Sequence, residues 1–213
     1  MYTLYGKVGS GSAAVEAALL VARKPFRIVE TASWEKNDAY ADLLAVNPIG
    51  QIPTLVLDDG SALSESAAIL IHLGTAHPDS KLLPSDMSER AQAVRGLVFI
   101  AANCYSAISI IDYPERWCQD ADNDEQVQAR IRAGTRARLH RHWEMFADMF
   151  TGRPYLGGEN LGALDLHAVV VSKWSGSRAH LKANRPAFHE TLMRIEAHPD
   201  VAPVLARNWP PDK

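Results

Sequence analysis

Cysteine is scarce in this sequence, and its scarcity limits both the expected compartment and the redox chemistry. The 213 residues include two cysteines, Cys104 and Cys118, which are too few for the disulfide framework of a secreted protein. They do not form a Cys-x-x-Cys pair, the spacing typical of redox and zinc sites. We therefore expect a protein of the reducing cytoplasm.

The sequence also has little net charge and no long apolar run. Its 22 basic and 25 acidic side chains leave a formal net charge of −3, which gives no general attraction to nucleic acid or anionic membranes. The longest uncharged apolar stretch, residues 97–111, contains four polar side chains and is shorter than the roughly 20 residues of a membrane span. Residues 13–22 have the length of a signal-peptide core, but Glu16 interrupts them. We expect neither a nucleic-acid partner nor a membrane-spanning segment.

Metal-binding patterns are missing as well. The eight histidines include no His-Glu-x-x-His motif, and none has a cysteine partner. His140 and His142 are separated by one residue, so on a helix they would point to different faces. We therefore expect no metal cofactor.

What the sequence does contain is an alternation of short strands and helices over its first 77 residues. The expected order is strand, helix, strand, helix, strand, strand, helix, at residues 2–5, 13–23, 26–30, 38–46, 54–57, 61–63 and 65–76. Asp58-Asp59-Gly60 separates the last two strands as a hairpin turn. Such an alternation, closed by a hairpin, predicts an α/β domain of the thioredoxin-like kind over residues 1–77.

The remainder of the chain predicts helices only. Apolar residues recur at three- and four-residue steps along two segments, which indicates two long amphipathic helices. These residues are Val94, Val98, Ala101, Tyr105 and Ile108 in the first segment, and Leu139, Trp143, Phe146 and Phe150 in the second. Residues 164–174 are apolar nearly all round and predict the buried central helix of a bundle, followed by shorter helices at 188–197 and 201–206. A proline-containing linker at 77–88 precedes this all-helical domain, which we place at residues 86–213.

Two segments near the end of the first domain form a motif. Asn47-Pro48-Ile49-Gly50-Gln51-Ile52-Pro53-Thr54-Leu55 is followed, at residues 64–69, by Ser-Glu-Ser-Ala-Ala-Ile. Both halves and their spacing resemble the glutathione-binding signature of glutathione transferases, and the resemblance covers essentially the whole chain. It implies a cytosolic, bacterial-like member of that family, with the two-domain fold predicted above.

The resemblance assigns these residues to glutathione. The cis form of an Ile-Pro bond costs only about 0.5–1 kcal/mol, and a cis bond at Ile52–Pro53 would present the Ile52 backbone to a bound peptide. Glu65 and Ser66 begin a helix, where free amides favour a carboxylate; by resemblance Ser66 binds the γ-glutamyl carboxylate and Glu65 its ammonium. Gln51 is expected at the glycyl carboxylate, with Lys36 as a further candidate. Loop termination and helix capping are the simpler alternatives for the same residues.

The Gly9-Ser10-Gly11-Ser12 loop lies where serine- and cysteine-type family members carry their thiol-activating residue. A thiol with a pKa near 8.5 is only a few per cent ionised at pH 7, and lowering that pKa by ~2 units requires ~2.7 kcal/mol. A helix dipole contributes ~0.3–1 kcal/mol, whereas a hydrogen bond to a charged acceptor contributes ~1.5–3 kcal/mol. We therefore expect a hydroxyl donor: Ser10 first, with Ser12 and Tyr5 as alternatives. Capping of the first helix by both serines is the competing explanation.

The chain departs from the family pattern at two places. Its loop has no cysteine, so thiol transfer through a mixed disulfide is disfavoured. At the start of the predicted central helix the family usually has Ser/Thr-x-x-Asp, whereas this chain has Gly162 in place of the hydroxyl residue. Asp165 can still accept a hydrogen bond from the Gly162 amide, so half of the capping box is retained.

The resemblance implies a transferase of the detoxification type, in which the glutathione thiolate attacks a small electrophile held between the domains. Glutathione is then a co-substrate, and a homodimer is expected. The electrophile pocket is expected to include Tyr105, Ser106 and Ser109, with Asn103 and Trp209 as further candidates, although all could equally be bundle core. Two other functions remain open: a zeta-type glutathione-dependent isomerase, whose loop reads Ser-Ser-Cys-Ser, and a non-catalytic transferase-like binding module.

Overall fold

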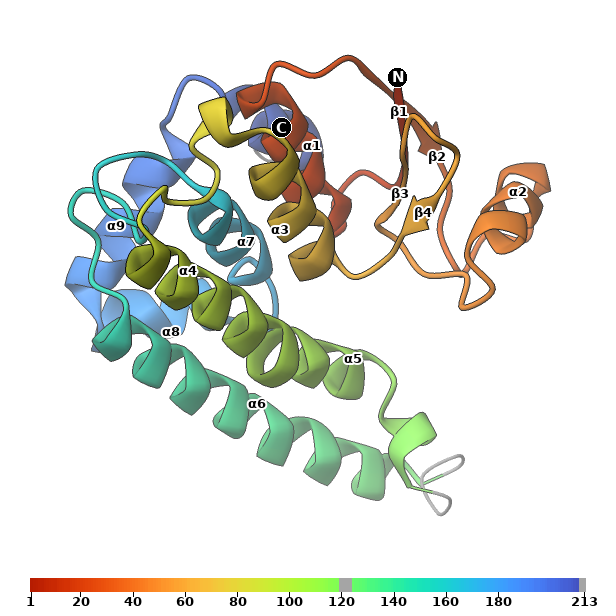
Figure 1. Cartoon of the computed structure of the whole chain (residues 1–213). Coiled ribbons are helices and arrows are strands. Elements are labelled where there is room, and N and C mark those ends of the chain that lie inside the picture. The colour runs from red at the N-terminus through yellow and green to blue at the C-terminus, as the bar shows by residue number, and fades with distance from the viewer. Residues whose placement is uncertain (119–123, 211–213) are drawn as a thin grey trace.

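The computed structural model describes residues 1–118 and 124–210, which form a small mixed sheet, its helices and a larger helical region (Figure 1). The first half contains β1 (Tyr2–Gly6), α1 (Ser12–Val21), β2 (Phe26–Glu30), α2 (Asp38–Val46), β3 (Thr54–Val56), β4 (Ala62–Leu63) and α3 (Ser66–Ala76). The strands lie in the order β2-β1-β3-β4, with β1 parallel to β2 and antiparallel to β3. The order of elements predicted for this thioredoxin-like half is confirmed.

The described residues of the second half are mainly helical, apart from a loop at 150–162 with an isolated bridge between Tyr155 and Gly158. It contains α4 (Met87–Phe99), a π-helical turn (Ile100–Tyr105), α5 (Ser106–Asp112), α6 (Glu125–Met149), α7 (Ala163–Val171), α8 (Ser177–Asn184), α9 (Pro186–Glu196) and α10 (Ala202–Asn208). Short 3₁₀ helices at Pro78–Ser80 and Pro114–Trp117 follow α3 and α5. Figure 1 shows α4 and α5 continuing along one line, with α6 running beside them.

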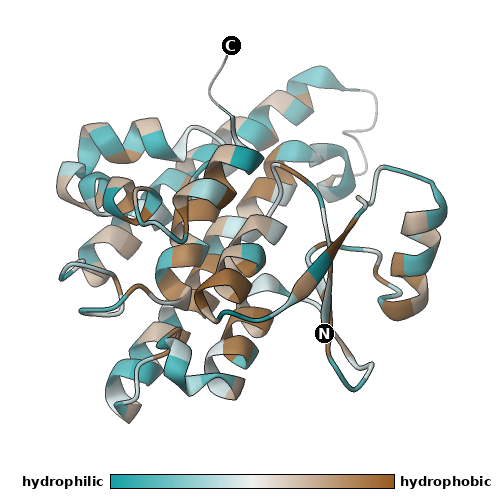
Figure 2. Ribbon diagram, turned by 90° about the horizontal axis from the view of Figure 1, so that it is seen from above, coloured by the Kyte–Doolittle hydropathy of each residue, from teal (hydrophilic) through white to brown (hydrophobic). Residues whose placement is uncertain are grey.

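Helix α7 is the centre of the molecule, as its apolar sequence predicts. All nine of its residues are buried, and it packs against α1 and α3 of the first half and against α4 and α9 of the second. In Figure 2 the hydrophobic segments gather on the helices in the middle, while the outer helices are more hydrophilic. The Gly162 amide donates to Asp165 Oδ2 over 2.9 Å, so the retained half of the capping box is confirmed. One hydrophobic core therefore joins both halves of the chain.

The continuous helical segment Met87–Asp112 is long and apolar enough to cross a membrane by length and composition alone. In the fold it is a core helix: Leu97, Ile100 and Cys104 are buried against the rest of the chain. Part of its apolar surface is thus packed inside the protein, while Val98 stays exposed.

The buried face of this segment differs from the predicted one. Val98 was expected on the buried stripe but is 52% exposed, whereas Ala93, Leu97, Ile100 and Cys104 are buried. The buried residues recur at three- and four-residue steps that continue unchanged through the π-helical turn at Ile100–Tyr105, one position away from the expected stripe: Ala93, Leu97, Ile100, Cys104, Ala107 and Ile111. The expected helical period is therefore correct, but the stripe chosen from the sequence lies one residue away from the face that packs into the core.

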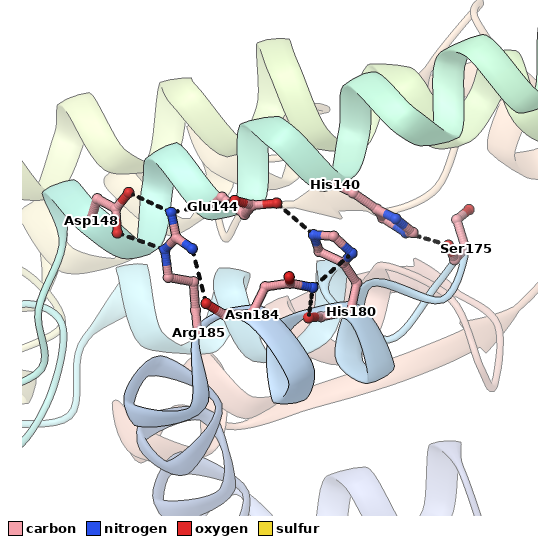
Figure 3. Close-up of polar contacts among 7 residues, drawn as sticks. All are labelled: His140, Glu144, Asp148, Ser175, His180, Asn184 and Arg185. Atoms are coloured by element: carbon pink, nitrogen blue, oxygen red, sulfur yellow. Dashed lines mark hydrogen bonds and ion pairs between the residues drawn. The ribbon is translucent and has the colours of Figure 1, made fainter.

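Helix α8 was not predicted, because few of its residues are apolar. It is held on α6 largely by the polar contacts shown in Figure 3. His180 Nε2 lies 2.7 Å from Glu144 Oε1, and Arg185, directly after α8, makes a bidentate ion pair with Asp148. The rings of His140 and His180 stack with their centroids 4.3 Å apart. Hydrophobic periodicity cannot reveal a helix that docks in this way.

Candidate active site

A cavity of about 450 Å³ lies where the thioredoxin-like half meets α5, and it collects most of the residues singled out by the sequence. Its lining includes the motif residues Gln51, Ile52, Pro53, Glu65 and Ser66, the loop residue Ser10, and the helical residues Tyr105, Ser106 and Ser109. A larger cavity of about 640 Å³ lies beside the linker and contains none of them. The smaller cavity is therefore the candidate site.

The turn before β3 is built by the polar residues of the first motif. The Ile52–Pro53 peptide bond is cis, as predicted. Asn47 Nδ2 donates to the Gln51 carbonyl over 3.2 Å, and the Thr54 hydroxyl donates to the same carbonyl over 2.8 Å. Asn47 and Thr54 are both buried, so these bonds are protected from water and hold the turn at the cavity wall.

The second motif places Glu65 and Ser66 at the start of α3. Glu65 has a φ of 65°, an unusual backbone conformation for a residue other than glycine, and such conformations concentrate at functional sites. Ser66 Oγ lies 3.1 Å from His167 Nε2 of the central helix. His167 is completely buried, its Nδ1 atom has no hydrogen-bond partner, and burial lowers its pKa to about 3. The imidazole is therefore neutral, and it supports Ser66 from behind the cavity wall.

The three candidate hydroxyl groups, those of Ser10, Ser12 and Tyr5, differ in whether they reach the cavity. Ser10 lines the cavity, and its hydroxyl donates to the Lys7 carbonyl over 2.7 Å. Ser12 is buried behind it and is not part of the lining; its Oγ lies 2.8 Å from Ser10 Oγ and accepts from the Lys7 amide over 3.2 Å. Tyr5 is buried in β1 opposite Thr54 and does not reach the cavity either. Of the three, only Ser10 is exposed to a ligand in the cavity.

The C-terminal helix holds this loop from outside the cavity. The Gly9 amide donates to Asn208 Oδ1 over 3.0 Å, and Asn208 Nδ2 donates to the Val204 carbonyl over 2.9 Å. Glu16 of α1 is buried and forms an ion pair with Arg207 of α10. The sequence offered no sign of these contacts, because they join residues from opposite ends of the chain.

Aromatic rings form the wall of the cavity on the helical side. Tyr105 stacks on Trp174 with a centroid distance of 5.7 Å and an interplanar angle of 18°, and its ring edge contacts His167. Burial, together with the charges of Glu65 and Asp112, raises the pKa of Tyr105 to about 12, although a hydrogen bond from the Gly11 amide acts in the opposite direction. Tyr105 is thus a protonated phenol next to the Ser10 loop.

Besides Ser12 and Tyr5, three predicted residues lie outside the lining. Lys36 is exposed and does not contribute to the cavity. Asn103 bonds back to the Phe99 carbonyl, while its own carbonyl faces His142 of α6. Trp209 packs edge-on against Trp174, so it lies behind the wall rather than in it.

Sequence reasoning missed several residues that line the cavity. They include Ser33, Asp112, Tyr113, Arg116 and Trp174. The guanidinium of Arg116 lies 3.9 Å above the centroid of the Tyr113 ring. Arg116 follows the end of α5, so its place in the lining depends on how the chain turns there, which no periodic pattern encodes.

Comparison with known proteins agrees with this geometry. Residues 12–76 match the family model described as glutathione S-transferase, N-terminal domain. The uncharacterized GST-like protein YncG of Escherichia coli K12 is 30% identical over 209 residues, which cover 98% of each chain. The chain belongs to the glutathione transferase family.

Other relatives show the breadth of that family. Glutathione S-transferase GstA of Escherichia coli O157:H7 is 28% identical, covering 95% of this chain and 96% of its own. Maleylacetoacetate isomerase of Pseudomonas aeruginosa is also 28% identical, covering 93% and 95%. Among solved structures, the ternary complex of BphK, a bacterial GST, is 26% identical with a TM-score of 0.79, over 95% of this chain and 97% of that one. A glutathione transferase homolog from Sulfitobacter with bound glutathione, 24% identical with a TM-score of 0.82 over 96% of each chain, has the same fold.

Neither cysteine of this family member lines the cavity. Cys104 is buried in the core, and burial raises the pKa of its thiol, which keeps it protonated and unreactive. Within residues 1–118 and 124–210, no group of three or more histidine, cysteine, aspartate or glutamate side chains is arranged to hold a metal ion. The chemistry available in the cavity comes from hydroxyls, carboxylates, one guanidinium and aromatic rings.

Proposed function

We propose that this family member conjugates the glutathione thiolate to a small electrophile. The observation that carries the proposal is the convergence of three distant segments on one cavity: the Ser10 loop, the turn at Ile52–Pro53, and Glu65–Ser66 at the start of α3. The second side of the cavity is open to a further ligand along α5, where Ser106 and Ser109 are exposed. The cavity thus has room for two reactants side by side.

The arrangement supports a definite orientation of glutathione. The Ile52 backbone pairs with the cysteinyl unit as a short added strand. Ser66 and the amides at the start of α3 take the γ-glutamyl carboxylate, and Glu65 takes the γ-glutamyl ammonium. Gln51 takes the glycyl carboxylate. The sulfur then faces the Ser10 loop, where a hydrogen bond from Ser10 stabilises the thiolate once its hydroxyl turns away from the Lys7 carbonyl.

Holding the electrophile beside Tyr105, Ser106 and Ser109 makes the attack effectively intramolecular. The thiolate sulfur forms a bond to the electrophilic carbon, and the leaving group departs with the electrons of its own bond. No residue of the chain needs to change its redox state. This is conjugation rather than thiol transfer, consistent with a loop that contains no cysteine.

The test is retention on immobilised glutathione followed by a conjugation assay with a model aromatic halide. We expect elution by free glutathione, measurable conjugation by the wild type, and loss of conjugation in Ser10→Ala. Ser61→Ala is the matched control, because Ser61 lies in the exposed turn before β4, far along the chain from the Ser10 loop. Binding without conjugation of any model electrophile would instead identify a non-catalytic binding module.

A glutathione-dependent isomerase is the second candidate, because the Pseudomonas aeruginosa maleylacetoacetate isomerase aligns with nearly the whole chain. Such an enzyme would also need a glutathione thiolate in this cavity, but would return glutathione unchanged. Incubation with maleylacetoacetate and catalytic glutathione distinguishes the two: isomerisation without consumption of glutathione supports the second function and contradicts the first.

We further infer a cytoplasmic homodimer. Arg95 of α4 bonds to Met149 of α6, so the exposed side chains of Val98 and Met145, one turn away on each helix, lie on the same side. An apolar patch of this kind is typical of a subunit interface. Sedimentation equilibrium should give a dimer, and Met145→Asp should weaken it; a monomeric wild type would contradict the inference.

A further inference from the structure

The Ser10 hydroxyl already has an acceptor within its own loop. Ser10 Oγ donates to the Lys7 carbonyl over 2.7 Å, and the neighbouring Ser12 hydroxyl lies 2.8 Å away. A hydroxyl has one proton to donate. While that proton points to Lys7, Ser10 presents acceptor lone pairs to the cavity, and these do not stabilise a thiolate. A second donor beside the loop would remove this limitation.

Tyr105 places such a hydroxyl against the same loop. The Tyr105 hydroxyl lies against the backbone of Gly11, whose amide can act toward it only as a hydrogen-bond donor. A Cβ atom on Gly11 would lie 2.9 Å from Tyr105 Cζ and would overlap the hydroxyl itself. Gly11 has φ −62° and ψ −13°, which any residue adopts, so its backbone does not require glycine. The missing side chain is required by the space that Tyr105 occupies.

The contact leaves the phenolic proton free. Because the Gly11 amide can donate but not accept a hydrogen bond, it leaves the hydroxyl proton of Tyr105 available for an acceptor in the cavity. The ring has little freedom to move, since it stacks on Trp174 and meets His167 edge-on. A donor that is held in place before the ligand binds needs no rearrangement at the moment of reaction.

The charges around the cavity make hydrogen-bond donors necessary. Among the described lining residues the charged ones are Glu65, Asp112 and Arg116. Two carboxylates oppose a nearby thiolate, and the guanidinium belongs to the exposed Arg116, where it stacks on the Tyr113 ring. Thiolate formation here depends on directed hydrogen bonds rather than on positive charge.

We propose that the Tyr105 hydroxyl donates a hydrogen bond to the glutathione sulfur and acts with Ser10 as a catalytic residue in thiolate formation. The inference rests on the proposed function, which brings the sulfur to the Ser10 loop. The thiol proton leaves to water, the sulfur keeps the electron pair, and Tyr105 retains its own proton. The sulfur then bonds to the electrophilic carbon while the leaving group departs with its bonding electrons.

The size of the effect follows from the strength of one hydrogen bond to a charged acceptor. Its loss should raise the pKa of the bound thiol by about one to two units. At a pH well below the thiol pKa, the fraction of thiolate falls by about ten- to 100-fold for the same reason.

The experiment is an ultraviolet titration of the thiolate in the binary complex with glutathione, for the wild type, Tyr105→Phe, Ser10→Ala and the double variant. Phenylalanine keeps the ring that stacks on Trp174 and removes only the hydroxyl. Tyr155→Phe is the control, since Tyr155 is a phenol outside the cavity lining. No electrophile is present, so a role of Tyr105 in electrophile binding cannot contribute to the titration.

Affinity for S-methylglutathione separates loss of the sulfur contact from damage to the loop, because this ligand has no thiolate. We expect Tyr105→Phe to raise the thiol pKa by at least one unit and to leave S-methylglutathione binding within about twofold. An unchanged thiol pKa, or equal weakening of both ligands, overturns the inference. If Ser10→Ala alone raises the pKa, the proposed function still stands. If the wild-type complex has the pKa of a free thiol, the proposed function fails too.

Discussion

Gly9 and Asn208 are 199 positions apart in the sequence, yet the amide of Gly9 donates to the side-chain oxygen of Asn208 over 3.0 Å. This bond joins the loop that carries Ser10 to the last residue of α10. Asn208 is 4% exposed, so water does not compete for the Gly9 amide. The C-terminal helix thereby fixes one end of the loop at the candidate site.

Asn208→Ala should therefore loosen the Ser10 loop. A buried amide without an acceptor costs about 1–3 kcal/mol in free energy of unfolding, and we expect kcat for conjugation to fall several-fold with a smaller change in KM for glutathione. Asn184→Ala is the matched control, because Asn184 likewise ends a short helix, α8, but lies outside the cavity lining. Equal kinetic losses in both variants would show that Asn208 has no particular role in positioning the loop.

Gly11→Ala tests why position 11 is glycine. The added Cβ would collide with the Tyr105 hydroxyl, so we expect the ring to be displaced, the thiol pKa of bound glutathione to rise and conjugation to fall. Gly134→Ala in α6 is the control, since a Cβ there meets no atom within 4 Å. In a helix that change should stabilise the protein by roughly 0.5–1 kcal/mol. Unchanged activity in Gly11→Ala would mean that Tyr105 can move aside without consequence.

Most of the fold could be predicted from local patterns. Three features could be recognised from a few neighbouring residues each: the alternation of short strands and helices, the Asp58-Asp59-Gly60 turn, and the largely apolar helix α7. The π-helical turn could not be predicted because the spacing of buried residues is the same across it as in an ordinary helix, and helix α8 could not be predicted because few of its residues are apolar. The boundary placed between residues 77 and 86 stays a prediction.

The candidate site was predictable only where it is contiguous in sequence. The motif residues around Pro53 and Ser66 could be found because their chemistry is tied to a turn and a helix start. Ser10 could be separated from Ser12 and Tyr5 only by their burial in the fold. The contacts of Gly9 with Asn208 and of Ser66 with His167 depend on tertiary packing, so no pattern in the neighbouring sequence indicates them.

Ser66→Ala should weaken glutathione binding and also destabilise the protein. Loss of the hydroxyl removes the proposed carboxylate ligand and leaves His167 Nε2 without its partner in a buried position. We expect KM for glutathione to rise about tenfold or more and the free energy of unfolding to fall by about 1–3 kcal/mol. Steady-state kinetics and urea unfolding measure the two effects. A loss of stability with unchanged KM would assign Ser66 a purely structural role.

Stability should depend on pH through His167. Burial lowers its pKa to about 3 in the folded protein, whereas an unfolded histidine has a pKa near 6.5, so the unfolded state binds the proton first as the pH falls. Its contribution to the free energy of unfolding is thus fully present above about pH 6.5 and is lost, at about 1.4 kcal/mol per unit, as the pH falls toward 3.

Asp165 acts in the opposite direction, because burial raises its folded pKa to about 7 and the folded state then holds the extra proton. Its contribution is lost as the pH rises from about 4 to 7, so the two slopes partly cancel in the wild type. The contribution of His167 is therefore measured as a difference between the wild type and His167→Gln, whose amide can still donate to Ser66 but does not titrate. Between pH 6.5 and 5 we expect the wild type to lose about 2 kcal/mol more than the variant in denaturant unfolding. If the unfolding free energies of the two proteins depended on pH in the same way, His167 would be protonated in the folded protein. The inference that a neutral imidazole supports Ser66 would then be wrong.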